Sequence, residues 1–228
     1  AALVTALGRI GVAPAATVGH SVGEVAAAWA AGALSLEDAV AVIHARSSRQ
    51  EATRGSGGMT AALCSAADVE ALIEDHPALS LAAVNSPRSV TLAGPVAALD
   101  AFEADARRRR IATRRLDLAY PFHCGLSDPV REPLLADLAG LAPRAPDIPM
   151  VSTVTGERID GAAVGAEYWW RNVRNPVRFL AAIETLLGDG HRRCRGIRGR
   201  AGRGASVRDG TSAGAGAGAL VGYLPGVS

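Results

Sequence analysis

Ser21 is the residue whose neighbours most clearly suggest chemistry. It stands at the centre of Gly19-His20-Ser21-Val22-Gly23, after a short apolar run and before an alanine-rich segment. A strand that turns sharply into a helix needs glycine where the turn is tightest, and such an elbow exposes the serine hydroxyl as a nucleophile. The following helix would direct its positive N-terminus at the point where an oxyanion forms. The alternative is a chance pentapeptide in a chain rich in glycine and alanine.

A serine hydroxyl needs a base within hydrogen-bonding reach before it becomes a useful nucleophile. The chain offers five histidines: His20, His44, His76, His123 and His191. The positions of His44 in a helix and of His76 beside a proline favour surface or packing roles. The side chain of His20 is expected to point away from the tip of the elbow. His123, in the segment AYPFHCG, is therefore the best candidate for the base, although a lone histidine is more often structural.

The composition excludes several classes of function. The 228 residues include no lysine, so all 24 cationic side chains are arginine, and the formal net charge is +2. Seven arginines fall within residues 192–208, and the rest of the chain is net acidic, which argues against a general nucleic-acid-binding surface. Three cysteines without C-x-x-C spacing indicate neither a disulfide framework nor a zinc site. No signal segment or long apolar run is present, so a reducing, cytoplasmic setting is expected.

The first part of the sequence predicts two helices around a short strand, followed by a third helix. Residues 1–10 have apolar positions at helical spacing, AATVGH is prone to form a strand, and a helix should run from Ser21 to about Ala31. Ser35 is placed as the N-cap of the next helix, with an acid at Asp38. A chain that begins inside a helix is expected to have been cut from something longer.

From Gly57 the periodicity changes and predicts a second unit. Residues 57–119 read as strand, helix, strand, strand, helix and strand, which is the order of a ferredoxin-like subdomain. We expect this unit to be inserted into a larger α/β lobe formed by residues 1–56 and 120–190. Residues 191–228 are rich in arginine and glycine with little apolar periodicity, so this tail is expected to be poorly ordered.

Together these residues resemble the acyltransferase domain of modular polyketide synthases, in the malonyl-CoA:acyl-carrier-protein transacylase family. The similarity runs in order over about residues 1–190. GHSVGEVAAAWAAGALSLEDAV resembles the nucleophile segment, RSSRQ the arginine segment, and GGMTAAL, AAVNSPRSVTLAG and YWWRNVRNPVRF the later blocks. The resemblance implies an α/β fold with an α/β-hydrolase-like large subdomain and an inserted ferredoxin-like small subdomain.

The resemblance also implies an acyltransferase reaction. Ser21 would attack an acyl-CoA thioester with His123 as general base, and the phosphopantetheine thiol of an acyl carrier protein would then take the acyl group. Arg46 would hold the free carboxylate of an extender unit through a bidentate pair, worth about 1.5–3 kcal/mol. The expected partners are the carrier protein and a neighbouring ketosynthase domain, with no nucleic acid and no membrane. No metal or bound cofactor is implied, since coenzyme A arrives with the substrate.

The four residues that end at the candidate base bear on the choice of extender unit. Family members with malonyl selectivity carry H-A-F-H here and methylmalonyl-selective ones Y-A-S-H, whereas this chain has the hybrid Tyr120-Pro121-Phe122-His123. Bulky Phe122 lies where an α-methyl group would project, which favours malonyl. The resemblance places Tyr120 and His20 at the substrate as well.

Two departures from the family affect these expectations. About ninety residues normally precede this point, including a G-Q-G-type loop that supplies one oxyanion donor, so the N–H of Val22 is the remaining donor. Loss of one such donor costs about 10²–10³ in rate. At the other end, HRRCRGIRGRAGRGA replaces an apolar strand, and a reading-frame shift between about His191 and Ala205 is our hypothesis.

Three other interpretations remain open at this point. A serine esterase or thioesterase of the α/β-hydrolase type shares the elbow, but it requires an acid between the serine and the histidine in chain order. An inactive acyltransferase fragment fits the unusual ends of the chain. RNA binding by the Arg/Gly tail fits its basic composition.

Overall fold

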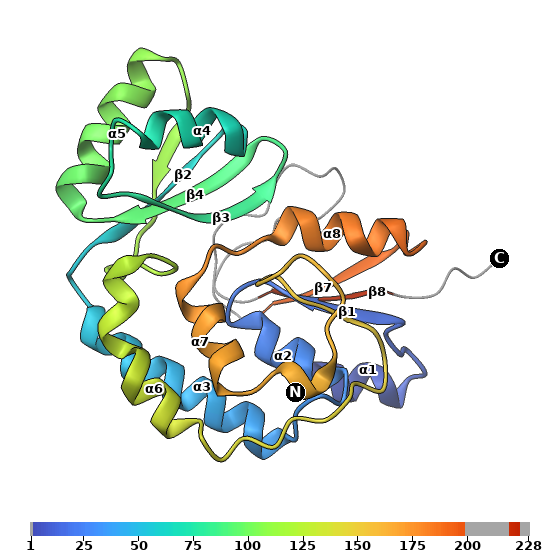
Figure 1. Cartoon of the computed structure of the whole chain (residues 1–228). Coiled ribbons are helices and arrows are strands. Elements are labelled where there is room, and N and C mark those ends of the chain that lie inside the picture. Colours follow the sequence, from blue (N-terminus) through green and yellow to red (C-terminus); the bar gives the residue numbers. More distant parts are fainter. Residues whose placement is uncertain (1, 199–218, 224–228) are drawn as a thin grey trace.

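The computed structural model describes residues 2–198 and 219–223. They form two lobes, each built on a four-stranded sheet (Figure 1). The large lobe contains α1 (Ala2–Arg9), β1 (Ala16–Gly19), α2 (Gly23–Ala30), α3 (Leu36–Gln50), the 3₁₀ turns η1 (Glu51–Thr53), η2 (Gly125–Val130) and η3 (Gly161–Ala163), α6 (Arg131–Asp137), β6 (Met150–Val151), α7 (Ala166–Arg174), α8 (Phe179–Gly188), β7 (Cys194–Arg198) and β8 (Ala219–Tyr223). The small lobe contains β2 (Gly58–Ala62), α4 (Ala66–Ile73), β3 (Ser80–Ser86), β4 (Ser89–Gly94), α5 (Val96–Arg108) and β5 (Thr113–Arg115).

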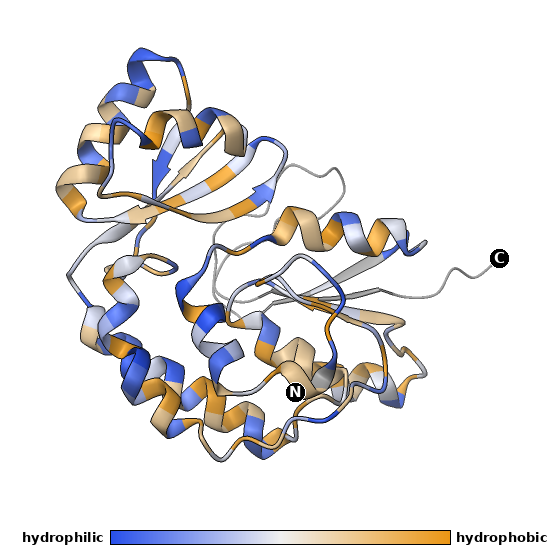
Figure 2. Ribbon diagram, viewed as in Figure 1, coloured by the Kyte–Doolittle hydropathy of each residue, from blue (hydrophilic) through white to orange (hydrophobic). Residues whose placement is uncertain are grey.

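The sheet of the large lobe lies between two layers of helices. Its strand order is β6-β1-β8-β7, with β1 parallel to β6 and antiparallel to β8. Successive side chains of a strand point to opposite faces, so Ala16 and Val18 pack against Leu186 of α8 while the hydroxyl of Thr17 donates to Ala27 O of α2 at 3.2 Å. Figure 2 shows α3 and α8 with both hydrophilic and hydrophobic residues, as expected for helices with one buried face.

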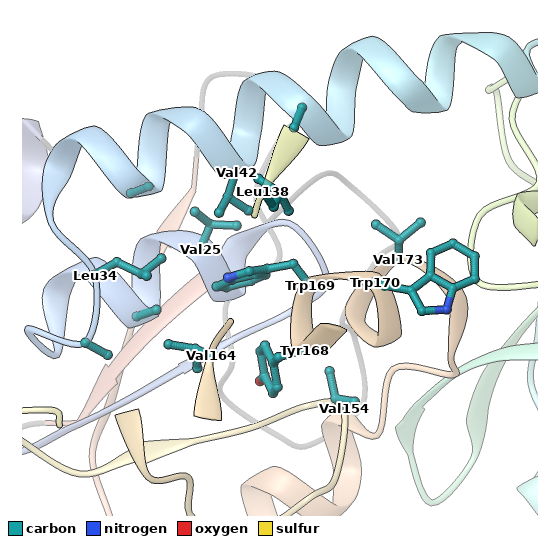
Figure 3. Close-up of a cluster of buried hydrophobic side chains, with 14 of the residues drawn as sticks. Val25, Leu34, Val42, Leu138, Val154, Val164, Tyr168, Trp169, Trp170 and Val173 are labelled. Carbon is teal, nitrogen blue, oxygen red and sulfur yellow. The ribbon is translucent and has the colours of Figure 1, made fainter. Parts of the chain in front are cut away.

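The main hydrophobic core of the large lobe joins α2, α3, α6 and α7. It contains the fully buried side chains of Val25, Val42, Leu134 and Trp169, one from each helix. Figure 3 shows the indole of Trp169 among the side chains of this cluster. This core fixes α2 and α3 relative to each other, and therefore fixes the two segments that carry Ser21 and Arg46.

The small lobe has the topology that the sequence predicted. Its strand order is β3-β4-β2-β5 with every neighbouring pair antiparallel, which is the ferredoxin-like arrangement. Helices α4 and α5 cover one face through a cluster that includes Val69, Leu72 and Phe102. Met59 and Leu116 lie in a different cluster, on the face turned toward the large lobe. All six elements lie within residues 57–119, although the last strand is limited to residues 113–115.

Two short parts of the tail, which the sequence predicts to be poorly ordered, lie in strands. Residues 194–198 and 219–223 form β7 and β8, and β8 pairs with β1 along the whole length of that strand. The physical reason is that strand pairing uses backbone N–H and C=O groups, so β7 needs no apolar alternation in its side chains. Residues 199–218 and 224–228 lie outside the described residues, and with them residues 199–205 of the segment proposed to be frame-shifted.

The described part of the chain contains neither a membrane-spanning helix nor a metal-binding cluster, and two of its cysteines are unpaired. No helix there is both long and apolar enough to cross a lipid bilayer. Within the same residues no group of three or more His, Cys, Asp or Glu side chains is placed to hold a metal ion. Cys64 and Cys124 are buried and unpaired.

Candidate active site

The turn at Ser21 has the tight geometry expected of a nucleophile elbow. Ser21 lies between β1 and α2 with a φ of 53°, in the left-handed region that residues with a side chain rarely adopt. A Cβ atom on Gly19 would lie 2.3 Å from the Cα of Glu24, so no larger residue fits there without moving the backbone. The strand, the turn and the glycine together hold the Ser21 hydroxyl at the start of α2.

The structure brings Ser21 and His123 into hydrogen-bonding contact. Ser21 Oγ lies 2.7 Å from His123 Nε2, although 102 positions separate the two residues in the chain. His123 Nδ1 lies 3.0 Å from the backbone oxygen of Asn175, and because a carbonyl only accepts, Nδ1 carries the imidazole proton. Nε2 is therefore the basic nitrogen, and it faces the serine hydroxyl that donates to it.

Burial keeps His123 neutral. Its side chain is only 4% exposed, and desolvation, followed by the nearby charges of Arg46 and His20, lowers its pKa from 6.5 to about 3. The hydrogen bond to Asn175 acts in the opposite direction but is the smaller effect. The imidazole is consequently available as a base at neutral pH.

Arg46 is a buried cation, and some of its N–H groups do not donate a hydrogen bond to any described residue. It is 2% exposed, and its Nε and one terminal nitrogen have no hydrogen-bonding partner among the described residues. Burial lowers its pKa to about 10, while the charge of Glu24 acts against that shift. Since a buried guanidinium is costly unless its N–H groups are satisfied, this arrangement is suited to an anion that enters from the cavity.

Ser21, His123 and Arg46 line one cavity of about 400 Å³ between the two lobes. The large lobe contributes these polar groups and Val22, whereas Met59 and Leu116 come from the open face of the small sheet. Most of the lining is apolar. The cavity therefore has a reactive, charged side on the large lobe and a mainly apolar side on the small lobe, which includes Thr91.

The remaining residues named from the sequence also line this cavity: His20, Tyr120 and Phe122. The expected orientation of His20 needs correction, because its ring faces the same cavity as Ser21. His20 Nε2 lies 2.8 Å from Asn85 Oδ1 on β3. The elbow alone gave no sign of this, since Asn85 belongs to the small lobe, which closes over the turn.

Sequence reasoning missed Glu24, whose carboxylate ties the elbow to α7 and to the loop after β6. It is fully buried and accepts from Thr153 N at 2.8 Å, Tyr168 OH at 2.5 Å and Asn172 Nδ2 at 2.5 Å. Burial raises the pKa of Glu24, and these hydrogen bonds oppose that rise. An acid in the first turn of a helix usually indicates only the helix dipole, so no local signal marked it.

The backbone oxygen of Asn175 was missed for a different reason. α7 ends at Arg174, and Pro176 prevents the helix from continuing, which leaves carbonyl groups in the last turn free to accept. The Asn-Pro pair marks the end of a helix. It does not indicate that one of the freed carbonyls meets a histidine 52 positions away.

Comparison with known proteins identifies the family of the chain. Residues 1–194 match the family model of the acyl transferase domain. The chain belongs to the acyltransferase domain family. It is 45% identical over 183 residues to the spectinabilin polyketide synthase system protein NorA' of Streptomyces orinoci, and 44% identical over 182 residues to the erythronolide synthase EryA2 of Saccharopolyspora erythraea. Each match covers 79% of this chain but only 5% of the relative.

Solved acyltransferase structures share the fold. The acyltransferase domain from module 8 of the salinomycin polyketide synthase superposes with a TM-score of 0.79 at 43% identity, covering 80% of this chain and 44% of that one. Malonyl CoA-acyl carrier protein transacylase from Clostridium perfringens gives a TM-score of 0.78 at 28% identity, covering 83% and 62%. These findings confirm the resemblance to polyketide synthase acyltransferase domains and the fold class drawn from the sequence.

Proposed function

We propose that this acyltransferase domain transfers a malonyl-type extender unit from coenzyme A, through an ester on Ser21, to the phosphopantetheine thiol of an acyl carrier protein. The observation that carries the proposal is one cavity holding a Ser21–His123 pair at 2.7 Å and the guanidinium of Arg46, two of whose nitrogens have no hydrogen-bonding partner among the described residues. A nucleophile with its base, beside a cation with free donors, fits a thioester substrate that also carries a carboxylate.

The first half of the reaction forms the ester. Ser21 Oγ attacks the thioester carbon while its proton passes to His123 Nε2, and the N–H of Val22 stabilises the oxyanion. When the tetrahedral intermediate collapses, the carbon–sulfur bond breaks and coenzyme A leaves as a thiol with the proton returned by His123. Asn175 O, bonded to Nδ1, holds the imidazole in the required tautomer and stabilises its protonated form.

The second half repeats these steps with another thiol. The carrier thiol gives its proton to His123 Nε2 and attacks the ester carbon, and Ser21 leaves with that proton restored. Arg46 keeps the extender carboxylate in place during both halves through charge-assisted hydrogen bonds. Phe122 and Tyr120 form the wall beside the α-carbon, with His20 on the elbow side of the cavity, and the bulk of Phe122 favours malonyl.

The esterase alternative is weakened by the partner of His123. In an α/β-hydrolase the histidine is oriented by an acidic side chain that precedes it in the chain, whereas here a backbone carbonyl that follows it occupies that position. A neutral carbonyl supports the base less strongly than a carboxylate does, and it places no negative charge directly against the His123 ring.

Mass spectrometry after exposure to an equimolar mixture of malonyl-, methylmalonyl- and acetyl-CoA tests the proposal. One malonyl group should appear on the peptide that contains Ser21 and be absent from a Ser21→Ala variant. The labelled protein is then divided between buffer and a phosphopantetheinylated carrier protein. Transfer to the carrier supports the acyltransferase, rapid loss to water supports the esterase, and failure to label supports an inactive fragment.

A further inference from the structure

The two chain segments that join the lobes are held together next to the cavity. Residues 51–57 leave α3 and enter the small lobe at β2, and residues 116–123 return from β5 to the large lobe. Gly55 N donates to Ala119 O at 2.7 Å, so the two connections are in contact through their backbones. Any movement of one lobe against the other must bend both connections.

Side chains reinforce this contact at Tyr120. The hydroxyl of Tyr120 donates its proton to Glu51 Oε2 at 2.6 Å and accepts from Arg54 Nε at 2.9 Å. Arg54 also pairs with Glu51 at 3.3 Å, and its guanidinium carbon lies 5.5 Å from the centre of the Tyr120 ring. We call Glu51, Arg54 and Tyr120 the linker clamp.

The linker clamp continues into the wall of the cavity. The rings of Tyr120 and Phe122 stack with centroids 5.3 Å apart and an interplanar angle of 6°. Both rings line the cavity, and Phe122 directly precedes His123. A bond that fixes the hydroxyl end of Tyr120 therefore fixes the face against which Phe122 rests.

We propose that Glu51 and Arg54 are positioning residues for extender selection, holding the Tyr120–Phe122 ring pair as a fixed wall of the cavity. This inference rests on the proposed function. Selection against an α-methyl group requires a cavity wall that does not move when the larger substrate enters. Two stacked rings on a connection between lobes can change position unless a polar end of one ring is held by hydrogen bonds. Tyr120 is anchored by a charged acceptor and a charged donor at once, so its position is set from two directions.

The double variant Glu51→Ala/Arg54→Ala, compared with wild type, tests the inference. Both proteins receive an equimolar mixture of malonyl- and methylmalonyl-CoA, and initial labelling of Ser21 is followed by mass spectrometry. Exposed polar contacts are individually weak, so we expect the malonyl-to-methylmalonyl ratio to fall by about three- to tenfold while malonyl labelling changes by less than about a factor of two. An unchanged ratio overturns the inference.

Arg49→Ala is the matched control. Arg49 also makes an exposed ion pair, with Asp137 at 2.7 Å, and it lies on the same helix as Arg46, but it does not line the cavity. The malonyl-to-methylmalonyl labelling ratio of Arg49→Ala should equal that of wild type. If Arg49→Ala lowers the ratio as much as the double variant does, the effect belongs to the helix surface, and the linker clamp has no special role.

A third variant and a thermal melt separate positioning from simple stability. Glu51→Gln keeps an oxygen that accepts from Tyr120 but removes the charge that pairs with Arg54, so its ratio should fall between those of wild type and the double variant. Equal slowing of both substrates with a lowered melting temperature would mean a structural role only and overturns the inference. If wild type labels Ser21 without discriminating, the inference fails while the acyltransferase proposal stands, whereas absence of Ser21 labelling defeats the proposed function itself.

Discussion

Acidification should leave Ser21 acylation almost unaffected down to about pH 5, and this prediction follows from the surroundings of His123. A general base works only in its neutral form, so the rate falls below the pKa of the free protein. Desolvation and the positive charge of Arg46 lower the pKa of His123 to about 3. The pH therefore has to fall well below the range in which an ordinary histidine becomes protonated before the acylation rate declines.

The expected difference is large enough to measure. A histidine with a pKa of 6.5 is only about 3% neutral at pH 5, which would slow acylation about thirtyfold relative to pH 8. With the pKa at about 3, His123 remains almost entirely neutral at pH 5 and the rate stays nearly constant. The assay is quenched-flow labelling by malonyl-CoA at low concentration, where the rate reports on the free protein, with intact mass as the readout.

An acidic limb with its midpoint near pH 6.5 would refute this reasoning, because it would mean that His123 titrates like a solvated imidazole. Saturating malonyl-CoA provides an internal comparison. A substrate carboxylate bound at Arg46 cancels part of the charge that lowers the His123 pKa, so the midpoint should move upward under saturation. Acetyl-CoA has no carboxylate and should produce no such movement.

Three further substitutions test the other parts of the site. Arg46→Ala should lower Ser21 labelling by malonyl relative to acetyl about ten- to hundredfold in the mixed-substrate assay, because the charged hydrogen bonds contribute about 1.5–3 kcal/mol; an unchanged preference would remove the carboxylate-binding role. Gly19→Ala places a Cβ 2.3 Å from Glu24 Cα, so labelling should be lost and urea unfolding should show a cost of about 1–3 kcal/mol or more. Glu24→Ala removes the buried acceptor that Thr153, Tyr168 and Asn172 share, and its urea midpoint should indicate about 3 kcal/mol or more lost, whereas a cost below about 1 kcal/mol would show that the network is dispensable.

The sequence was informative where a feature depends on residues close together in the chain. The elbow at Ser21 is predicted by glycine spacing within five residues. The small lobe is predicted because the repeat of apolar residues alternates between about two residues, typical of a strand, and about 3.6 residues, typical of a helix. Ser35 caps α3 as expected, accepting from Asp38 N at 3.0 Å. Each of these features depends on the conformation of a short segment, so the residues within that segment are enough to predict it.

The features that escaped sequence reasoning depend on distant partners. Glu24 meets Thr153 from 129 positions away, and the burial of Arg46 results from the packing of α3 rather than from its own neighbours. β7 escaped because its pairing with β8 uses backbone groups that every residue carries. In each case the residue type is common and its importance comes only from a contact with a distant part of the chain. No pattern of neighbouring residues could therefore have predicted that contact.

The position of the small lobe in the chain explains how such a site can vary its substrate without losing its chemistry. The insertion separates Ser21 from His123 in sequence, yet both residues are held by the large lobe, through the elbow and through Asn175 O. The small lobe contributes Met59, Ala83, Thr91 and Leu116, none of which carries an acidic or basic side chain. Substitutions on that open face change the shape of the cavity while the 2.7 Å Ser21–His123 contact is maintained by elements on the other side. On the proposed function, the small lobe shapes part of the cavity while Arg46 and Phe122 also act in extender selection, and the large lobe carries the attack on the thioester. The linker clamp lies where the two lobes connect.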